Sequence, residues 1–81
     1  MPNYYHFIKS PIKTKKYRAL FNDGSYVDFG ARFYTQYEDK ALGLYSNYNN
    51  LDKKKRENYY KRHNIDYPKY TADWFSKKYL W

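Results

Sequence analysis

KYRALFNDGSYVDF (residues 16–29) is the stretch that decides the fold of this chain. Two short runs of β-forming side chains flank Asp23-Gly24, and a two-residue Asp-Gly loop favours a type I′ turn, in which both central residues have positive φ. The stretch therefore predicts a β-hairpin in which Phe21 faces Tyr26 and Leu20 faces Val27. In that register one face of the hairpin carries Arg18, Leu20, Val27 and Phe29, and the other carries Tyr17, Phe21 and Tyr26.

The twenty residues after the hairpin give weaker signals. Residues 31–40, ARFYTQYEDK, fit either a helical stripe or a turn-rich segment. Residues 41–50, ALGLYSNYNN, contain Gly43 and three asparagines, which indicates an irregular connection. Within it we expect Leu44 and Tyr45 to pack inward.

Residues 52–64, DKKKRENYYKRHN, predict a helix. Asp52 is a good N-cap and Asn64 a plausible C′ residue. The inward face of this helix is narrow and depends on Tyr59 and Tyr60. Three lysines in its first turn oppose the helix dipole, which favours acidic residues at that position. Such an unfavourable arrangement without visible compensation indicates a functional reason.

The last eleven residues, TADWFSKKYLW, predict a second helix. Thr71 is a candidate N-cap, and Tyr70 and Phe75 are spaced as a hydrophobic staple. We expect the core to include Trp74, Phe75, Leu80 and Trp81. The predicted fold is a small single α+β domain, with an N-terminal β-hairpin packed on two short helices around an aromatic-rich core.

Upstream of the hairpin, residues 1–15 predict a basic N-terminal arm, which leaves residues 16–81 as the single domain. Residues 9–16, KSPIKTKK, carry four lysines and no acid, and Pro11 forbids a central helix or strand. Before them, the run from Tyr4 to Ile8 looks like a short strand or a docking segment.

Composition explains how so polar a chain can fold. It has 13 Tyr, 5 Phe and 2 Trp among 81 residues, so aromatic rings replace the scarce aliphatic side chains. There is no cysteine, which excludes disulfides and thiolate metal sites. No apolar run approaches the roughly 20 residues of a membrane span, and the first ten residues lack the apolar stretch of a secretion signal.

The net charge of +8 points to a negatively charged partner, although it is also compatible with simple solubility. The helix at 52–64 is the best functional candidate. Its alternative is a solvated helix face without a partner. Lysines would give sequence-independent contact with phosphates. The residues predicted to contact nucleic acid are Lys53, Lys54, Lys55, Arg56, Lys61 and Arg62 on the helix, and Lys13, Lys15 and Lys16 on the arm.

Catalysis is not expected. His6 and His63 are far apart in sequence, and the chain has no metal-ligand spacing and no glycine-rich phosphate loop. Asp28 is expected to form a hydrogen bond with the turn or to pair with Arg18 or Arg32, and His63 to cap or pack the helix end. We therefore predict a protein that is not an enzyme and that needs no metal or cofactor.

Three stretches taken together carry a family resemblance: YRALFNDGSYVDFGA (17–31), GLYSNYNNLDKKKRENYYKRHN (43–64) and WFSKKYLW (74–81). Their order and spacing resemble a family of short basic proteins of unknown function encoded by nucleocytoplasmic large DNA viruses of protists and algae. Residues 1–15 fall outside the resemblance. It implies an origin in a giant or algal virus and an intact domain, and it implies no mechanism.

These observations favour a viral protein that binds nucleic acid, double-stranded DNA first, and helps to package or organise the genome. Such a protein would reside in the virion or in the viral factory of the host cytoplasm. One alternative is a minor capsid or cement protein that binds acidic virion protein surfaces. Another is an adaptor that acts on a host complex by binding an acidic patch.

Overall fold

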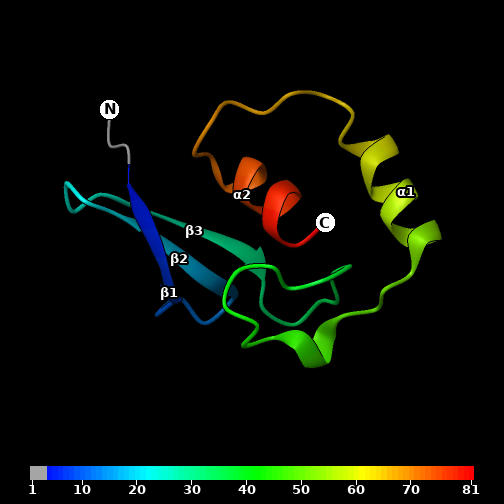
Figure 1. Ribbon diagram of the computed structural model, residues 1–81, viewed down its shortest axis with the longest axis horizontal. Coiled ribbons are helices and arrows are strands. Elements are labelled where there is room, and N and C mark those ends of the chain that lie inside the picture. Colours follow the sequence, from blue (N-terminus) through cyan, green and yellow to red (C-terminus); the bar gives the residue numbers. More distant parts are fainter. Residues whose placement is uncertain (1–3) are drawn as a thin grey trace.

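The computed structural model describes residues 4–81 and forms an α+β domain, as the sequence predicts. Three antiparallel strands, β1 (Tyr5–Lys9), β2 (Lys15–Phe21) and β3 (Tyr26–Ala31), lie in the order β1-β2-β3. A 3-10 turn, η1 (Ser46–Tyr48), and two helices, α1 (Lys53–Arg62) and α2 (Ala72–Tyr79), follow. In Figure 1 the sheet lies at one end of the molecule, α2 lies near the middle and α1 lies at the opposite end.

The β2–β3 hairpin is present, but its predicted register is wrong by one residue. Leu20 pairs with Tyr26 rather than with Val27. The turn has three residues, Asn22 to Gly24, because the Phe21 N–H donates to the Ser25 carbonyl at 2.9 Å. Gly24 has φ +90°, whereas Asp23 does not have positive φ. The Gly24 N–H donates to the Phe21 carbonyl at 3.0 Å, and the Asp23 carboxylate accepts from the Ser25 N–H at 3.0 Å. This geometry is a type I turn followed by a left-handed glycine, not a type I′ turn.

The one-residue shift exchanges the residues on the two faces, because side chains alternate along a strand. Tyr17, Ala19 and Phe21 lie on the core face, where Tyr17 is paired with Phe29 and Ala19 with Val27. The opposite face of the hairpin carries Arg18, Leu20, Tyr26 and Asp28.

β1 extends the hairpin to a three-stranded sheet. Tyr5 pairs with Phe21 and Lys9 with Tyr17, so residues 5–9 lie within the sheet although the sequence pattern predicted a basic arm there. Of the two possibilities for the run from Tyr4 to Ile8, the structure contains the strand. The first three residues of the expected arm lie outside the described residues, and the division into arm and domain stays a prediction.

Aromatic rings form the core, as the composition predicts. Phe75, on α2, is fully buried and stacks against Phe29 of β3 with a centroid separation of 5.2 Å. The phenol oxygens of Tyr5 and Tyr79 are 2.6 Å apart, which joins β1 to the last helix. Edge-to-face and offset contacts of this kind add about 0.5–1.5 kcal/mol per pair to the burial of the rings.

The irregular segment between β3 and α1 is organised by the buried carboxylate of Asp39. This carboxylate accepts hydrogen bonds from the Tyr17 hydroxyl and from the backbone N–H groups of Ala41 and Tyr45. Tyr45 is buried as predicted. The prediction that Leu44 packs inward is wrong: its side chain is 55% exposed, and its backbone N–H donates to the Tyr17 hydroxyl at 3.0 Å.

α2 begins as predicted, with the Thr71 hydroxyl accepting from the Trp74 N–H. The rings of Tyr70 and Phe75 lie 6.2 Å apart, which agrees with the staple. Phe75 and Leu80 are buried, whereas Trp74 and Trp81 are half-buried at the edge of the core. None of the helices in residues 4–81 combines the length and apolar character needed to cross a membrane.

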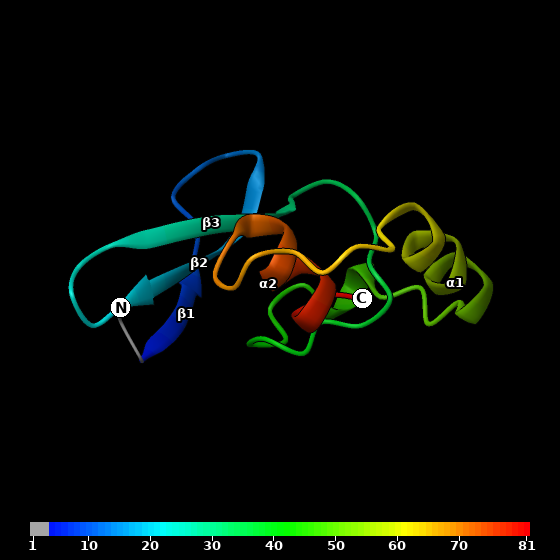
Figure 2. The ribbon, with the colours of Figure 1, turned by 90° about the horizontal axis from the view of Figure 1, so that it is seen from above.

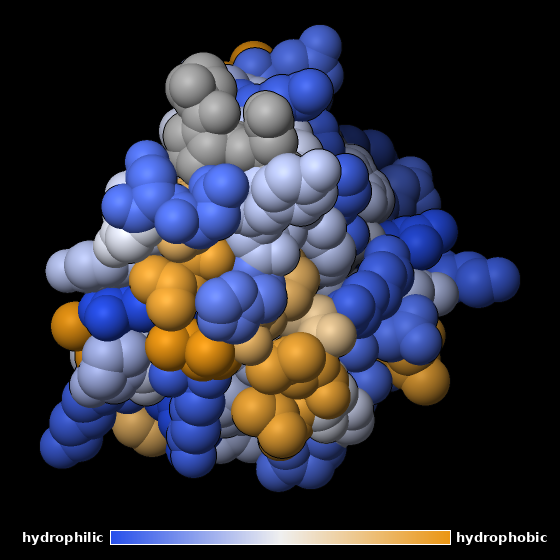
Figure 3. All heavy atoms as spheres, turned by 60° about the vertical axis from the view of Figure 1, so that its left-hand side comes forward, coloured by the Kyte–Doolittle hydropathy of each residue, from blue (hydrophilic) through white to orange (hydrophobic). Residues whose placement is uncertain are grey.

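The face of the sheet that is turned away from α2 is mixed in character. It exposes Ile8 and Tyr26, but the Arg18 guanidinium lies 3.7 Å from the Tyr26 ring centroid and pairs with Asp28 at 3.0 Å. Figure 3, which brings the sheet side of the molecule forward, shows small apolar groups separated by polar side chains rather than one continuous apolar patch.

Candidate nucleic-acid interface

α1 begins at Lys53 because Asp52 caps it. The Asp52 carboxylate accepts hydrogen bonds from the backbone N–H groups of Lys54 at 2.9 Å and Lys55 at 3.2 Å. This is the predicted N-cap, and it satisfies two of the donors that a helix start leaves unpaired. The first turn contains no acidic residue, so its lysines lie at the positive end of the helix dipole.

Lys53, Lys54 and Lys55, which we call the basic turn, are all exposed. No carboxylate within residues 4–81 forms an ion pair with any of them. Figures 1 and 2 both show α1 at the far end of the molecule from the hairpin tip, and in the described part of the chain it packs against no strand. The basic turn is therefore accessible to a large negative partner.

The three other cations predicted on α1 differ in their surroundings. The Arg56 guanidinium is half-buried, 4.4 Å from the ring centroid of Tyr37. Lys61 pairs with Glu57 at 3.3 Å, but both side chains are mostly exposed, so the pair contributes less than about 1 kcal/mol. Arg62 is exposed. Lys61 and Arg62 could therefore join the basic turn in contacting phosphate.

The arm lysines do not lie beside α1. Lys13 is exposed in the connection between β1 and β2, and Lys15 is half-buried at the start of β2. Figures 1 and 2 place this connection beyond α2 as seen from α1. The two groups of cations occupy separate parts of the surface.

Lys16 does not lie on the surface at all. It is 1% exposed, and its ammonium donates to the Tyr34 carbonyl at 2.6 Å and lies 5.3 Å from the Tyr48 ring centroid. Burial lowers the pKa of this ammonium to about 8. The expectation that Lys16 contacts phosphate does not fit this position, because the segment after β3 covers it.

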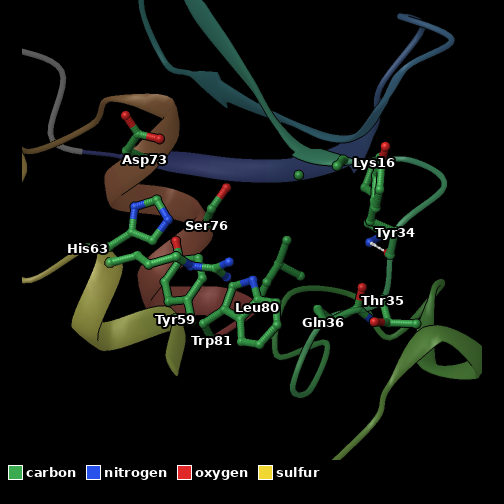
Figure 4. A pocket seen from close by; sticks show the side chains of 13 residues that line it. Lys16, Tyr34, Thr35, Gln36, Tyr59, His63, Asp73, Ser76, Leu80 and Trp81 are labelled. Carbon is green, nitrogen blue, oxygen red and sulfur yellow. Dashed lines mark hydrogen bonds between the residues drawn. The ribbon is translucent and has the colours of Figure 1, made fainter. Parts of the chain in front are cut away.

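Lys16 lies in the wall of a pocket of about 410 Å³ between α1, α2 and residues 30–36. Figure 4 shows His63 and Asp73 at one side of the pocket, Lys16 and Tyr34 at the other, and Tyr59 and Trp81 between them. The Gln36 side chain in this wall donates to the Tyr45 carbonyl at 2.9 Å, and its own buried oxygen has no partner among the described residues. Lys16 and Gln36 are each only 1% exposed, so little of either side chain is open to the pocket.

The structure places His63 and Asp28 as expected. His63 is the C-cap of α1, stacks on Tyr59 at 4.2 Å, and its Nδ1 lies 2.5 Å from the Tyr67 hydroxyl oxygen. Asp28 receives two hydrogen bonds from Arg18. Across residues 4–81, no three His, Cys, Asp or Glu side chains are grouped so that they could hold a metal ion.

A second pocket, of about 450 Å³, lies where the end of α1 meets the loop before α2 and α2 itself. We call it the aromatic pocket; it is lined by Tyr60, Asp66, Tyr67, Trp74, Lys77 and Lys78. This site was not predicted from the sequence. The sequence shows that Trp74 and Lys78 lie one helical turn apart. Only the folded structure brings Tyr60 and Tyr67 next to them.

Comparison with known protein families gives a match over the first half of the chain. Residues 5–41 match a family of unknown function (DUF5754), so the match covers the sheet and the segment after it, which is less than half of the chain. It agrees with the expectation of an uncharacterised family, and the viral origin stays a prediction. Neither the search of curated proteins nor the search of solved structures found a significant match.

Proposed function

We propose that this protein binds the phosphate backbone of nucleic acid through the basic turn of α1, with little sequence preference. Exposed lysines without internal ion pairs among the described residues are the observation that carries the proposal. Lysine supplies a point charge rather than a base-reading fork, so its contacts are insensitive to sequence. In the setting implied by the sequence resemblance, this activity would package or organise a viral genome in the virion or the viral factory.

The helix dipole supports this proposal. Three lysines at the N-terminus of α1 lower the stability of the helix by a few tenths of a kcal/mol each, a cost that the N-cap carboxylate of Asp52 offsets only in part because the first turn itself contains no acid. A bound phosphate would offset it, because helix N-termini favour anions.

Charge reversal in the basic turn tests the proposal. In Lys53→Glu with Lys54→Glu, we expect affinity for a random-sequence duplex to fall, and the slope of log affinity against log salt to decrease by about 1.8, since each lost contact removes about 0.9. With three to five phosphate contacts, the wild-type affinity should fall about 40- to 500-fold between 50 and 200 mM salt. Fluorescence anisotropy measures both quantities.

The matched control is Lys40→Glu with Lys69→Glu, which changes the net charge equally at two exposed lysines outside α1. We expect this variant to keep most of the wild-type salt slope. Equal losses in the two variants would show that overall charge, not the basic turn, governs binding. Absence of duplex binding by the wild type at 50 mM salt would refute the proposal.

An acidic protein surface is the second candidate partner. The exposed Tyr26 ring under the Arg18 guanidinium favours it, because Tyr and Arg are enriched at the energetic centres of protein interfaces. The protein would then be a minor capsid or cement component, or an adaptor on a host complex. Tyr26→Ser should then release the protein from emptied particles without changing its binding to DNA, as measured by fractionation of purified particles.

A further inference from the structure

The aromatic pocket offers three aromatic side chains and two lysines to one guest. Tyr60 comes from α1, Tyr67 from the loop, and Trp74 from α2. Tyr60 is 37% exposed, and Tyr67 and Trp74 are half-buried, so all three can be reached. The volume of about 450 Å³ falls in the range of small-molecule sites.

The lysines cover the rings in this structure. The Lys77 ammonium lies 5.6 Å from the Tyr60 ring centroid and 6.0 Å from that of Tyr67, and the Lys78 ammonium lies 4.8 Å from the Trp74 ring. Exposed cation–π contacts of this kind contribute only about 0.5–1 kcal/mol. A flat guest that stacks on an aromatic ring gains about 1–3 kcal/mol per base, so it can displace an ammonium.

The charges exclude a cationic guest. Lys77 and Lys78 outnumber the single carboxylate, Asp66, and the two ammonium groups already occupy the positions at which a methylated lysine would bind. A guest with a flat ring and a negative group suits the site better, because the displaced lysines then gain an ionic partner.

The pocket also continues the surface of the basic turn. Tyr60 follows Lys53 by seven residues, which places both on the same side of α1, about 10 Å apart along its axis. Glu57, between them, pairs with Lys61. One strand of nucleic acid can therefore contact the basic turn and reach the pocket.

We propose that the aromatic pocket takes an unpaired nucleobase, with Tyr60, Tyr67 and Trp74 stacking on the base and Lys77 and Lys78 moving to the flanking phosphates. This inference rests on the proposed function, because the basic turn supplies further phosphate contacts to the same strand from the other end of α1. It adds a substrate class: single-stranded nucleic acid binds more tightly than duplex of the same length.

Two probes with equal phosphate number test the inference on the wild-type protein. One is an oligo(dT) strand, and the other is the same sugar–phosphate strand without bases. Stacking of one base predicts about 5- to 150-fold tighter binding of oligo(dT), which is the fold-change for about 1–3 kcal/mol. Equal affinities for the two strands would refute the binding of a base in the aromatic pocket.

A variant then locates the effect. Tyr60→Ala should lose most of the preference for oligo(dT) over the base-free strand and keep its affinity for duplex, with Tyr34→Ala, another exposed tyrosine, as the matched control. Equal losses on all probes would mean that Tyr60 acts only through the helix, and would overturn the inference. Circular dichroism confirms that each variant is folded.

The two proposals can fail separately. If the protein binds duplex through the basic turn but does not distinguish oligo(dT) from the base-free strand, the pocket alone is refuted. If it prefers oligo(dT) through Tyr60 but the Lys53→Glu, Lys54→Glu variant keeps the wild-type salt slope, the basic turn is refuted and the pocket stands.

Discussion

Lys15 and Lys16 are adjacent in sequence and lie in different environments. Lys15 stays half-buried at the end of the sheet, while the ammonium of Lys16 is enclosed beside Tyr34 and Tyr48. The carboxylate of Asp39, which acts on this ammonium electrostatically, already accepts hydrogen bonds from Tyr17, Ala41 and Tyr45. Among the described residues Lys16 is thus a buried cation without an ion pair, which is costly for the folded state.

This cost predicts a pH dependence of stability. Unfolded Lys16 keeps its proton up to about the ordinary lysine pKa of 10.5, whereas burial lowers the pKa in the folded state to about 8, so between these values the unfolded state binds more protons. Stability from this group therefore rises with pH, by up to about 3 kcal/mol. Urea unfolding of the wild type and of Lys16→Met at pH 8 and pH 10 should show that the variant lacks this rise.

Tyrosines act in the opposite direction at higher pH. Burial raises the pKa of Tyr59 to about 12 and that of Tyr17 above its usual range. Above about pH 10 the folded state holds more protons than the unfolded state, so stability falls there in both the wild type and Lys16→Met. If Lys16→Met lost both the increase of stability between about pH 8 and 10 and the decrease above about pH 10, the increase could not be assigned to Lys16.

Gly30 is the other residue whose environment predicts a measurable effect. It has φ +82°, and an added Cβ would lie 2.9 Å from Leu80 Cδ1 and 3.2 Å from Lys16 Cβ. Gly24 has a similar φ of +90° but open space around it. Gly30→Ala should therefore destabilise by about 1–3 kcal/mol more than Gly24→Ala, which carries only the backbone strain.

Thermal unfolding measures this difference, because 1 kcal/mol shifts Tm by about 4–8 °C in a domain of this size. Similar Tm values for Gly24→Ala and Gly30→Ala would show that the Leu80 side chain can move aside without loss of folding free energy. The close approach of the C-terminal segment to β3 would then not be specific.

At the scale of elements, α1 should become more stable when the proposed phosphate contacts of the basic turn are removed. Lys53→Glu with Lys54→Glu places two acids at the positive end of the helix dipole, where each contributes about 0.3–1 kcal/mol. We expect helicity and the urea midpoint to stay equal to the wild type or rise while duplex affinity falls. A loss of stability would show that these lysines hold the helix in place.

The sequence predicted where helices and strands begin better than it predicted how the strands pair and which elements come into contact. Helix starts at Asp52 and Thr71 were predictable because side-chain caps act within four residues. The hairpin register was not, because Asp-Gly also suits a three-residue turn, and one residue of difference exchanges the faces. The burial of Lys16 and the assembly of the aromatic pocket depend on contacts between distant segments, which carry no local signal.

At the scale of the whole molecule, α1 is joined to the rest by aromatic contacts. The Tyr59 ring stacks on Trp81 with a centroid distance of 4.6 Å and an interplanar angle of 4°, and Arg56 covers Tyr37. No strand packs on α1 in the described part of the chain. The position of the basic turn relative to the sheet therefore depends on this ring pair, on the Arg56–Tyr37 contact and on the Leu51 N–H, which donates to the Tyr37 carbonyl.

Trp81→Ala should loosen α1 while leaving the sheet intact. An aromatic pair contributes about 0.5–1.5 kcal/mol beyond its buried area, so amide hydrogen exchange in α1 should speed up about two- to tenfold or more. Amides of β2 should keep their protection, and Tyr34→Ala should change neither. Uniformly faster exchange would mean that Trp81 stabilises the whole domain as one cooperative unit.

The hydrogen bond between Tyr5 and Tyr79 joins the beginning of the sheet to the end of α2, and Phe75 and Leu80 complete the same core. During synthesis, β1, β2 and β3 emerge from the ribosome well before these residues do. Until they emerge, the aromatic core face of the nascent sheet stays exposed to solvent and to chaperones. A premature stop codon just ahead of Phe75 would leave that face permanently uncovered, and we expect such a product to be degraded rather than accumulate as a shortened domain.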